Sequence, residues 1–375
     1  GENDTGKSTV SKGLFSMFHG FYHLKEKIHR DKKENLANLL SRTFITKDNH
    51  SDSVETSRSN NEARKKYFGQ IANTLLEKFS ATVTSDYQSL SSEFKKFFQE
   101  NFEGLFSDET IDELFPKFLD LLNIQNTEIG KSILSRTLNV EFYNQVNSLY
   151  TKDTGKIKLT IKQKTNSVVV KSNKVTQLDE NIPIETDVIY FDNPLLLNQV
   201  QTMFLSKENF HFADHQEWLL WNLQNNLRYP YLDKMVEQNS DSFVTEEILI
   251  EKRLQKIYEK LNIICGGTVI SKKNVLGEWT YKQEDDREIF LKNLSTGLKT
   301  FVILKFLLQK GALSFGSTLI LDEPEIHVHP KWQLVLAELI VLLNKEFQVH
   351  ILLNTHSPYF LRAIEVYSQK HGISD

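Results

Sequence analysis

Residues 1–9 read GENDTGKST. The stretch matches the phosphate-binding pattern G-x-x-x-x-G-K-[ST] at every defined position. In such a loop, backbone N–H groups surround the phosphates of a nucleotide, and the N-terminus of the following helix adds a favourable dipole. By position, Lys7 would reach the β- and γ-phosphates, Ser8 would bind Mg²⁺ and Thr9 would lie near the α-phosphate. The other predicted nucleotide-binding positions of the loop are Gly1, Asn3, Asp4, Thr5 and Gly6.

A pattern this short also occurs in unrelated loops, so the assignment needs support from a second motif. That motif is acidic. Residues 317–322 read STLILD, and Glu323 follows directly. A buried strand explains the apolar residues, but it does not explain two adjacent carboxylates at its carboxyl end, where α/β proteins place ligands. In P-loop enzymes an Asp at this point holds Mg²⁺, and the next Glu can polarise the attacking water. Asp322 is therefore a predicted metal ligand and Glu323 a predicted general base.

Two further segments carry residue types that suit phosphate binding. Residues 294–299 read LSTGLK and precede a helical run. Ser295 can serve there simply as a helix N-cap, but a Ser and a Gly at a helix N-terminus also form an anion site, because Gly297 permits close backbone approach. Residues 348–355 predict a strand that leads into His356. This histidine is either a satisfied strand-end residue or a sensor of the γ-phosphate.

The order of these motifs resembles the ABC-type ATPase heads of SMC-like proteins and of the OLD family. LSTGLKT looks like the ABC signature, LILDEPEIHVHP like Walker B with its D-loop, and NTHSP like the switch-histidine loop. The forms EPEIHVHPKWQ and THSPYFL are most similar to the OLD-like group, including the PtuA-type ATPases of Septu systems and retrons. The resemblance is specific in residues 1–9 and 290–365. It implies an α/β fold, in which a P-loop ABC-type head with a mixed sheet flanked by helices carries a large α-helical insertion.

Hydrophobic periodicity extends this organisation to the rest of the chain. Apolar residues recur every four positions within 62–150, whereas 157–161, 168–170 and 188–191 have the alternating or β-branched character of strands. Another helix is expected at 246–261, capped by Thr245. The expected parts are the start of the head at 1–30, the helical insertion at 31–150, a β segment at 151–197, a helical segment at 198–264 and the end of the head at 265–375. Because the chain opens inside the phosphate-binding motif, we expect it to be a fragment without its native N-terminus.

The resemblance also implies how the site works. Two heads would associate head to tail around ATP, so the protein would be a homodimer or a higher oligomer. The implied roles are catalysis by Glu323 and His356, nucleotide binding in cis by Lys7 and its loop, Mg²⁺ binding by Ser8 and Asp322, and contact with the opposite subunit's nucleotide by Ser295 and Gly297. The signature departs from LSGGQ at Thr296 and Leu298. The resemblance therefore does not fix the rate of hydrolysis, which could be slow or depend on a partner. No Q-loop glutamine can be assigned.

The function implied is that of an Mg-ATP-hydrolysing, OLD-like ATPase that dimerises around ATP and regulates a nuclease in a prokaryotic anti-phage defence system. The nuclease would be an HNH-type partner or a Toprim domain beyond residue 375. The alternatives are an SMC-like ATPase of DNA repair or maintenance, an OLD-type nuclease whose Toprim domain is absent here, a transporter ATPase subunit and a non-hydrolysing ATP-gated scaffold.

Composition limits the classes of protein and partner. The 375 residues are 25% charged with a formal net charge of -4, which is typical of a globular chain and argues against a generally basic nucleic-acid wrapper. A local run of lysines is either a solvated face of a sheet, which is the more common case, or a contact for nucleic-acid phosphates. These residues are Lys156, Lys158, Lys162, Lys164, Lys171 and Lys174.

The single cysteine, Cys265, fits the reducing cytoplasm. No apolar run approaches the roughly 18 residues of a membrane span, so no membrane partner is expected.

Two histidine groups have spacings that metal sites also show. His211, Asp214 and His215 could share one face of a helix, although a solvated face is the favoured interpretation. His327 and His329 alternate in the manner of zinc ligands, but they fall in the D-loop-like segment, which already accounts for them.

Overall fold

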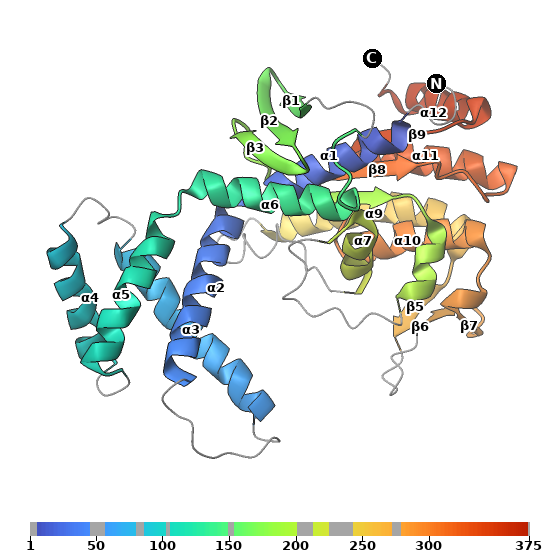
Figure 1. Cartoon of the computed structure of the whole chain (residues 1–375). Coiled ribbons are helices and arrows are strands. Elements are labelled where there is room, and N and C mark those ends of the chain that lie inside the picture. The colour runs from blue at the N-terminus through green and yellow to red at the C-terminus, as the bar shows by residue number, and fades with distance from the viewer. Residues whose placement is uncertain are drawn as a thin grey trace. The chain divides into compact units, whose positions relative to one another are not determined.

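The computed structural model describes residues 6–45, 57–79, 86–102, 106–148, 154–200, 213–224, 243–271 and 279–373. The chain forms two compact units (Figure 1). The first combines Gly1–Tyr22 with Ile133–Asp375, and the second comprises His23–Ser132. The domain boundaries drawn from the sequence stay predictions.

The second unit is helical. Its helices are α2 (Leu24–Ile45), α3 (Ser57–Phe79), α4 (Tyr87–Asn101), α5 (Asp108–Asn123) and the start of α6 (Asn126–Glu141), which ends in the first unit. Phenylalanines fill its core, and the rings of Phe94 and Phe118 stack with centroids 4.9 Å apart. Ser107 caps α5 by accepting a hydrogen bond from the backbone N–H of Thr110. The four-residue apolar spacing thus marks the buried faces of these helices.

The first unit is built on a parallel sheet with the strand order β4-β8-β9. The strands are β4 (Val188–Phe191), β8 (Thr318–Asp322) and β9 (His350–Asn354), and both strand pairs are parallel. β4 is wholly buried and so is β8 up to Asp322, which explains why the two strands are almost continuously apolar in sequence. The predicted strands at 188–191 and before His356 are confirmed.

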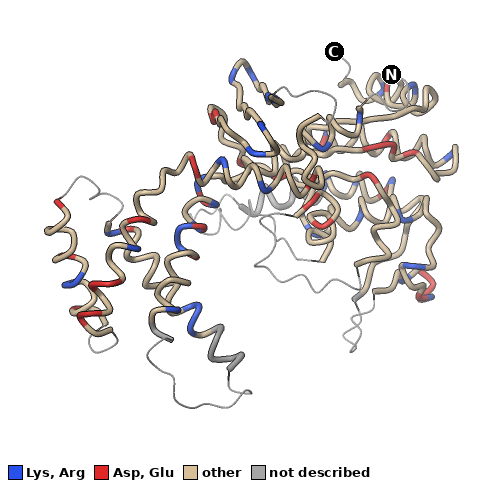
Figure 2. Tube along the Cα trace, viewed as in Figure 1, with Lys and Arg blue, Asp and Glu red and all other residues tan. Residues whose placement is uncertain are grey.

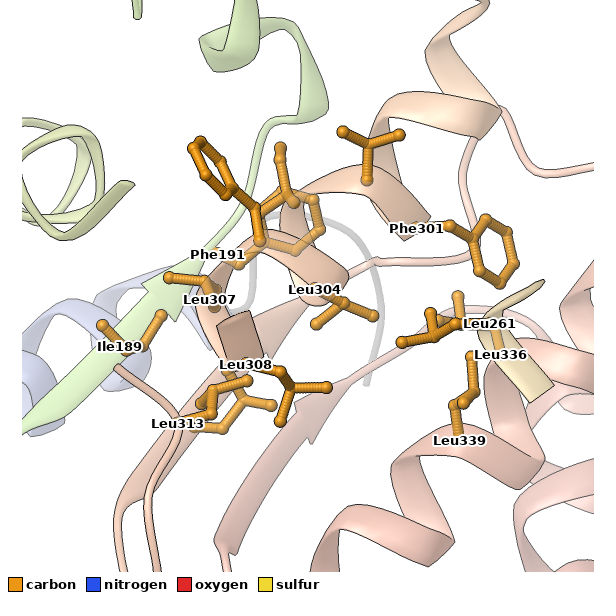
Figure 3. Close-up of a cluster of buried hydrophobic side chains, with 14 of the residues drawn as sticks. Ile189, Phe191, Leu261, Phe301, Leu304, Leu307, Leu308, Leu313, Leu336 and Leu339 are labelled. Atoms are coloured by element: carbon orange, nitrogen blue, oxygen red, sulfur yellow. The ribbon is translucent and has the colours of Figure 1, made fainter. Parts of the chain in front are cut away.

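Helices cover this sheet and supply most of its core. They are α1 (Lys7–Phe21), α7 (His215–Gln224), α9 (Phe243–Cys265), α10 (Thr296–Gln309), α11 (Pro330–Phe347) and α12 (Pro358–His371), with short 3-10 helices η1 (Pro194–Gln199) and η3 (Leu291–Asn293). α1 packs on β4 and β8, and α11 packs on β9. Figure 3 shows Phe301, Leu304 and Leu336 meeting in this core. Each such buried side chain contributes about 1.5–3 kcal/mol relative to an exposed one.

Two antiparallel sheets complete the first unit. One contains β1 (Gly155–Ile161), β2 (Lys164–Lys171) and β3 (Lys174–Asp179), and the other contains β5 (Thr268–Ser271), β6 (Trp279–Lys282) and β7 (Glu288–Phe290). The strands predicted at 157–161 and 168–170 are confirmed. The lysines singled out in the sequence lie along β1–β3 and their turns (Figure 2).

One predicted helix boundary is wrong. α9 begins at Phe243, so Thr245 lies within the helix and does not cap it. A Thr is compatible with either position, and local sequence determines the ends of helices less well than their existence. In the described segments, none of the helices combines the length and the apolar character needed to cross a membrane.

Candidate functional site

The carboxyl ends of β8 and β9 place the predicted acidic and histidine motifs next to each other. Asp322 and Asn354 are register partners at the ends of the two strands. The backbone N–H of Glu323 donates to the carbonyl of Asn354 at 2.8 Å, and Glu323 has a positive φ of 50°. The chain therefore leaves β8 in a sharp turn, which holds Glu323 beside the loop that carries His356.

The first helix brings the predicted phosphate-binding lysine to the same point. Gly6 caps α1 with a φ of 83°, a left-handed conformation that favours glycine. Nζ of Lys7 lies 3.1 Å from Nε2 and 3.3 Å from Nδ1 of His356. Nε2 of His356 lies 3.2 Å from Oε1 of Glu323. A cation, a carboxylate and an imidazole thus converge on one spot, and all three are partly exposed.

Asp322 is held through both of its carboxylate oxygens. The hydroxyl of Tyr190 donates to Oδ2 at 3.0 Å, and Nδ2 of Asn354 donates to Oδ1 at 3.2 Å. Asn354 also donates to the hydroxyl of Ser11 on α1 at 2.7 Å. Burial, together with the neighbouring Asp322 carboxylate, raises the pKa of Tyr190, so the phenol keeps its proton and remains a donor. The sequence alone did not single out Tyr190, Asn354 or Ser11.

A cavity of about 330 Å³ lies at these strand ends. Its polar lining includes Ser8, Asp192, Asp322 and Glu323. Hydroxyl and carboxylate oxygens are the donors that Mg²⁺ prefers, and Mg²⁺ is usually held by one or two carboxylates together with water and nucleotide phosphates. The donor set therefore fits a hydrated Mg²⁺, with Ser8 and Asp322 able to hold it.

Asp192 is a cavity residue that sequence reasoning missed. Asp192 directly follows β4, and Asp322 is the last residue of β8. The two strands are parallel neighbours. The sequence did contain a signal for Asp192, because it is an acid that directly follows an apolar strand. The carboxyl ends of parallel strands meet at one edge of the sheet, so such an acid is expected near Asp322.

The signature-like segment has a structural role within its own subunit. Ser295 is exposed and caps α10, where its hydroxyl accepts a hydrogen bond from the backbone N–H of Leu298 at 3.4 Å. Gly297 is buried, and a Cβ at this position would lie 2.7 Å from the carbonyl oxygen of His327. Helix capping and close packing thus account for both residues locally. Neither of them lines the cavity with Ser8 and Asp322, and contact with a second subunit's nucleotide stays a prediction.

Other parts of the predicted loop are less informative. Thr9 is exposed in the first turn of α1. The remaining loop positions lie outside the described residues: Gly1, Asn3, Asp4 and Thr5.

The EPEIHVHP segment is tied to the switch-histidine loop. The hydroxyl of Thr355 donates to the carboxylate of Glu325, which is buried. Gln333 steadies the same turn through hydrogen bonds to the carbonyls of Glu325 and Val328 at 3.2 and 3.1 Å. His329 caps α11 by accepting from the backbone N–H of Lys331. These contacts hold the Glu323 turn and the His356 loop together.

One of the two histidine groups with metal-like spacing behaves differently from what the sequence indicated. The solvated helix face favoured for His215 is wrong: its side chain is 5% exposed and contacts two carboxylates. The hydrophobic environment comes from Tyr190 and Phe15, which local spacing does not reveal. His211 lies outside the described residues. Among the residues that the structure describes, no group of three or more His, Cys, Asp and Glu is arranged to hold a metal ion.

Comparison with known families agrees with this geometry. A family model described as "AAA domain, putative AbiEii toxin, Type IV TA system" matches residues 1–362. The match spans the phosphate-binding loop, both strand ends and His356. It also spans the helical second unit. The chain therefore belongs to this family of AAA-domain proteins of the P-loop ATPase class.

Proposed function

We propose that the chain binds Mg-ATP and hydrolyses it between two copies of the ATPase head, and that its nucleotide state controls a partner nuclease in prokaryotic anti-phage defence. The observation that carries the ATPase part is the meeting of Lys7, Glu323 and His356 within 3.1–3.3 Å. These groups come from both ends of the chain, and each has a type and position suited to one role in phosphoryl transfer.

Phosphoryl transfer requires positioning and charge compensation more than covalent help from the protein. The Lys7 ammonium neutralises the phosphate oxygens, and His356 hydrogen-bonds to the terminal phosphate. The Glu323 carboxylate accepts a hydrogen bond from the attacking water and orients it. Ser8 and Asp322 would hold Mg²⁺, which would supply compensation for the negative charge of the phosphates.

Dimerisation is supported by the exposed residues around the cavity. Leu195 and Ile326 line it and are 46% and 45% exposed, and Val10 in the first helical turn is 64% exposed. Larger contiguous apolar patches rimmed by polar residues mark protein–protein interaction sites, and these side chains would contribute to such a surface in the proposed dimer. In the proposed head-to-tail arrangement, Ser295 and Gly297 of one copy approach the nucleotide of the other. The departure at Thr296 and Leu298 favours slow turnover.

The defence role is supported at the level of the family and of the sequence motifs. The family description includes the words "putative AbiEii toxin, Type IV TA system". The EPEIHVHPKWQ and THSPYFL forms add the resemblance to PtuA-type ATPases. We therefore propose an HNH-type nuclease partner, with a Toprim domain outside this sequence as the alternative, and nucleic acid as the material acted on. A cytoplasmic location belongs to the proposal, supported by the buried, unpaired Cys265.

A non-hydrolysing, ATP-gated scaffold is the second candidate, favoured by the altered signature. Glu323→Gln separates the two functions. If Glu323 is the general base, the variant binds ATP and accumulates as an ATP-bound dimer, whereas wild type with ATP returns to monomers after turnover. Glu365→Gln removes a carboxylate of the same size from the surface of α12, where it pairs with Arg362, and should behave as wild type. Equal dimer lifetimes in Glu323→Gln and wild type would favour the scaffold.

A further inference from the structure

A buried acid–histidine–acid cluster lies beside the candidate site. The imidazole of His215, at the start of α7, lies between Glu141 at the end of α6 and Asp192 after β4. Nδ1 is 2.7 Å from Oε1 of Glu141, and Nε2 is 3.0 Å from Oδ2 of Asp192. Asp192 also lines the 330 Å³ cavity together with Ser8 and Asp322.

We propose that His215 and Glu141 are positioning residues that hold the Asp192 carboxylate toward this cavity, where it accepts hydrogen bonds from the water shell of the nucleotide's divalent cation. The inference rests on the proposed Mg-ATP function. It adds the residues that determine how much Mg²⁺ the protein needs to bind and hydrolyse the nucleotide.

The hydrogen bonds around His215 leave its ring one orientation. Each ring nitrogen faces a carboxylate oxygen, and carboxylates only accept, so both nitrogens donate. The backbone N–H of His215 donates to the second oxygen of Glu141 at 3.0 Å. Burial opposes the positive charge, but the hydrogen bonds with Asp192 and Glu141 outweigh it and raise the pKa of His215 to about 9. The ring is therefore an imidazolium that links the two acids.

Asp192 is restrained from two sides and keeps part of its surface free. Nε2 of Gln216 donates to its oxygens at 3.3 and 3.1 Å, in addition to the contact with His215. Burial alone would raise the pKa of Asp192, but the hydrogen bond with His215 lowers it below the ordinary value. The side chain is 26% exposed, against 5% for His215 and 0% for Glu141. An ionised carboxylate thus faces the cavity at the outer end of the cluster.

The same histidine also contacts the residue that holds Asp322. The imidazole of His215 stacks on the ring of Tyr190 with centroids 4.2 Å apart, and the hydroxyl of Tyr190 donates to Asp322 at 3.0 Å. Tyr190 and Asp192 are two positions apart at the end of β4. His215 is therefore placed to fix two of the three acids that line the cavity, Asp192 by a direct bond and Asp322 through Tyr190.

Asp192 is the outer, partly exposed member of the cluster and also lines the cavity. Its carboxylate is therefore placed to meet the water shell of a cation there, which gives the cluster a role beyond packing. Groups that orient the polar residues of a metal site in this way typically change metal affinity or activity by about 10–100-fold when they are mutated.

The test compares His215→Gln, Asp192→Asn and the double variant in the full chain. Fluorescent ATP-analogue binding is titrated with MgCl₂ and repeated in EDTA, and the MgCl₂ concentration for half-maximal ATPase activity is measured in parallel. We expect both single variants to need about tenfold more Mg²⁺, with nucleotide binding in EDTA unchanged. The double variant should need at least as much Mg²⁺ as Asp192→Asn, but less than the product of the two single effects, because His215 acts mainly through Asp192. His350→Gln, at the exposed start of β9, is the matched histidine control.

Unchanged Mg²⁺ dependence in both single variants would overturn the inference, even if thermal stability fell. If His215→Gln fails to fold, Asp192→Asn decides the matter, since its side chain is partly exposed and retains its shape. Wild type that binds the analogue in a Mg²⁺-dependent way but releases no phosphate would contradict the proposed hydrolysis alone, because the binding titration still reports on the cluster.

Discussion

The ammonium of Lys7 lies 3.1 Å from Nε2 of His356, although 349 positions separate the two residues in the chain. The contact joins the first turn of α1 to the loop after β9. Oε1 of Glu323 lies 3.2 Å from the same nitrogen, Nε2. The site is therefore assembled only when the two ends of the first unit fold together, which makes nucleotide binding a probe of that assembly.

Replacing Lys7 by Ala removes the ammonium from this meeting point. A hydrogen bond to a charged group contributes about 1.5–3 kcal/mol, so ATP affinity should fall at least tenfold. Calorimetric titration with Mg-ATP measures this loss. Lys12→Ala is the control on the same helix, where the ammonium lies 5.5 Å from the ring of Tyr143, and it should leave affinity unchanged. Equal affinities for Lys7→Ala and wild type would remove Lys7 from the binding site.

Ser295→Ala separates helix capping from contact with a second subunit. Loss of the cap on α10 should lower stability by about 0.5–2 kcal/mol. Under the proposed dimer it should also weaken ATP-dependent association in the Glu323→Gln background, while nucleotide binding by the monomer stays intact. Light scattering after size-exclusion chromatography measures the dimer. Ser107→Ala is the control, because it removes a comparable cap from α5 in the second unit. If both variants changed association to a similar extent, helix capping alone would explain the effect of Ser295→Ala.

Gly297→Ala tests the close packing between α10 and the His327 turn. The new Cβ would lie 2.7 Å from a backbone oxygen, and a forced backbone shift of this kind typically costs about 1–3 kcal/mol. Urea denaturation should show this loss. Gly13→Ala, on α1 with open space around the position of a Cβ, is the control and should not be destabilised. A neutral Gly297→Ala would show that the turn moves aside freely.

The ion cluster around Glu338 predicts a pH-dependent stability. Burial alone would raise its pKa, but Lys260, Lys370 and His371 at 2.9–3.1 Å outweigh burial and lower the pKa to about 2. A carboxyl whose pKa is lower in the folded state stabilises the fold above its unfolded-state pKa of 4.5 and loses this contribution as pH falls toward 2. Glu338→Gln should therefore be less stable than wild type at pH 7, by about 1–2 kcal/mol because the partners are partly exposed.

The measurement is urea denaturation of both proteins at several pH values. The difference between them should narrow below about pH 4.5, in line with the linkage relation. Glu365→Gln, which changes an exposed ion pair, should show a smaller difference at pH 7. A gap between Glu338→Gln and wild type that persists undiminished at low pH would assign the effect to packing.

The sequence supported the parts of the site that lie at strand ends. An apolar strand followed by Asp322 and Glu323, and another that leads to His356, predict neighbouring positions because parallel strands end at the same edge of a sheet. The local pattern also offered helix capping as one of the two roles considered for Ser295. These features depend on a few adjacent residues, so local pattern is sufficient to find them.

The remainder depends on contacts between distant residues. His215 has the spacing of a surface helix, and only its partners Glu141 and Asp192, 74 and 23 positions away, place it in a buried ion cluster. The close packing of Gly297 against the carbonyl of His327 is also a contact between separate parts of the sequence. Tyr190 is an ordinary strand residue in sequence, and its bond to Asp322 follows from the pairing of β4 with β8.

Single-turnover phosphate release from bound ATP separates hydrolysis at Glu323 from ATP binding alone. Wild type and Glu323→Gln are loaded with a substoichiometric amount of radiolabelled ATP and Mg²⁺, and the bound nucleotide is quantified in the same samples. If Glu323 is the general base, both proteins bind ATP, and phosphate release by Glu323→Gln is at least about 100-fold slower, because a general base contributes about 10²–10⁴-fold. Equal rates of phosphate release at equal occupancy would rule out this role for Glu323.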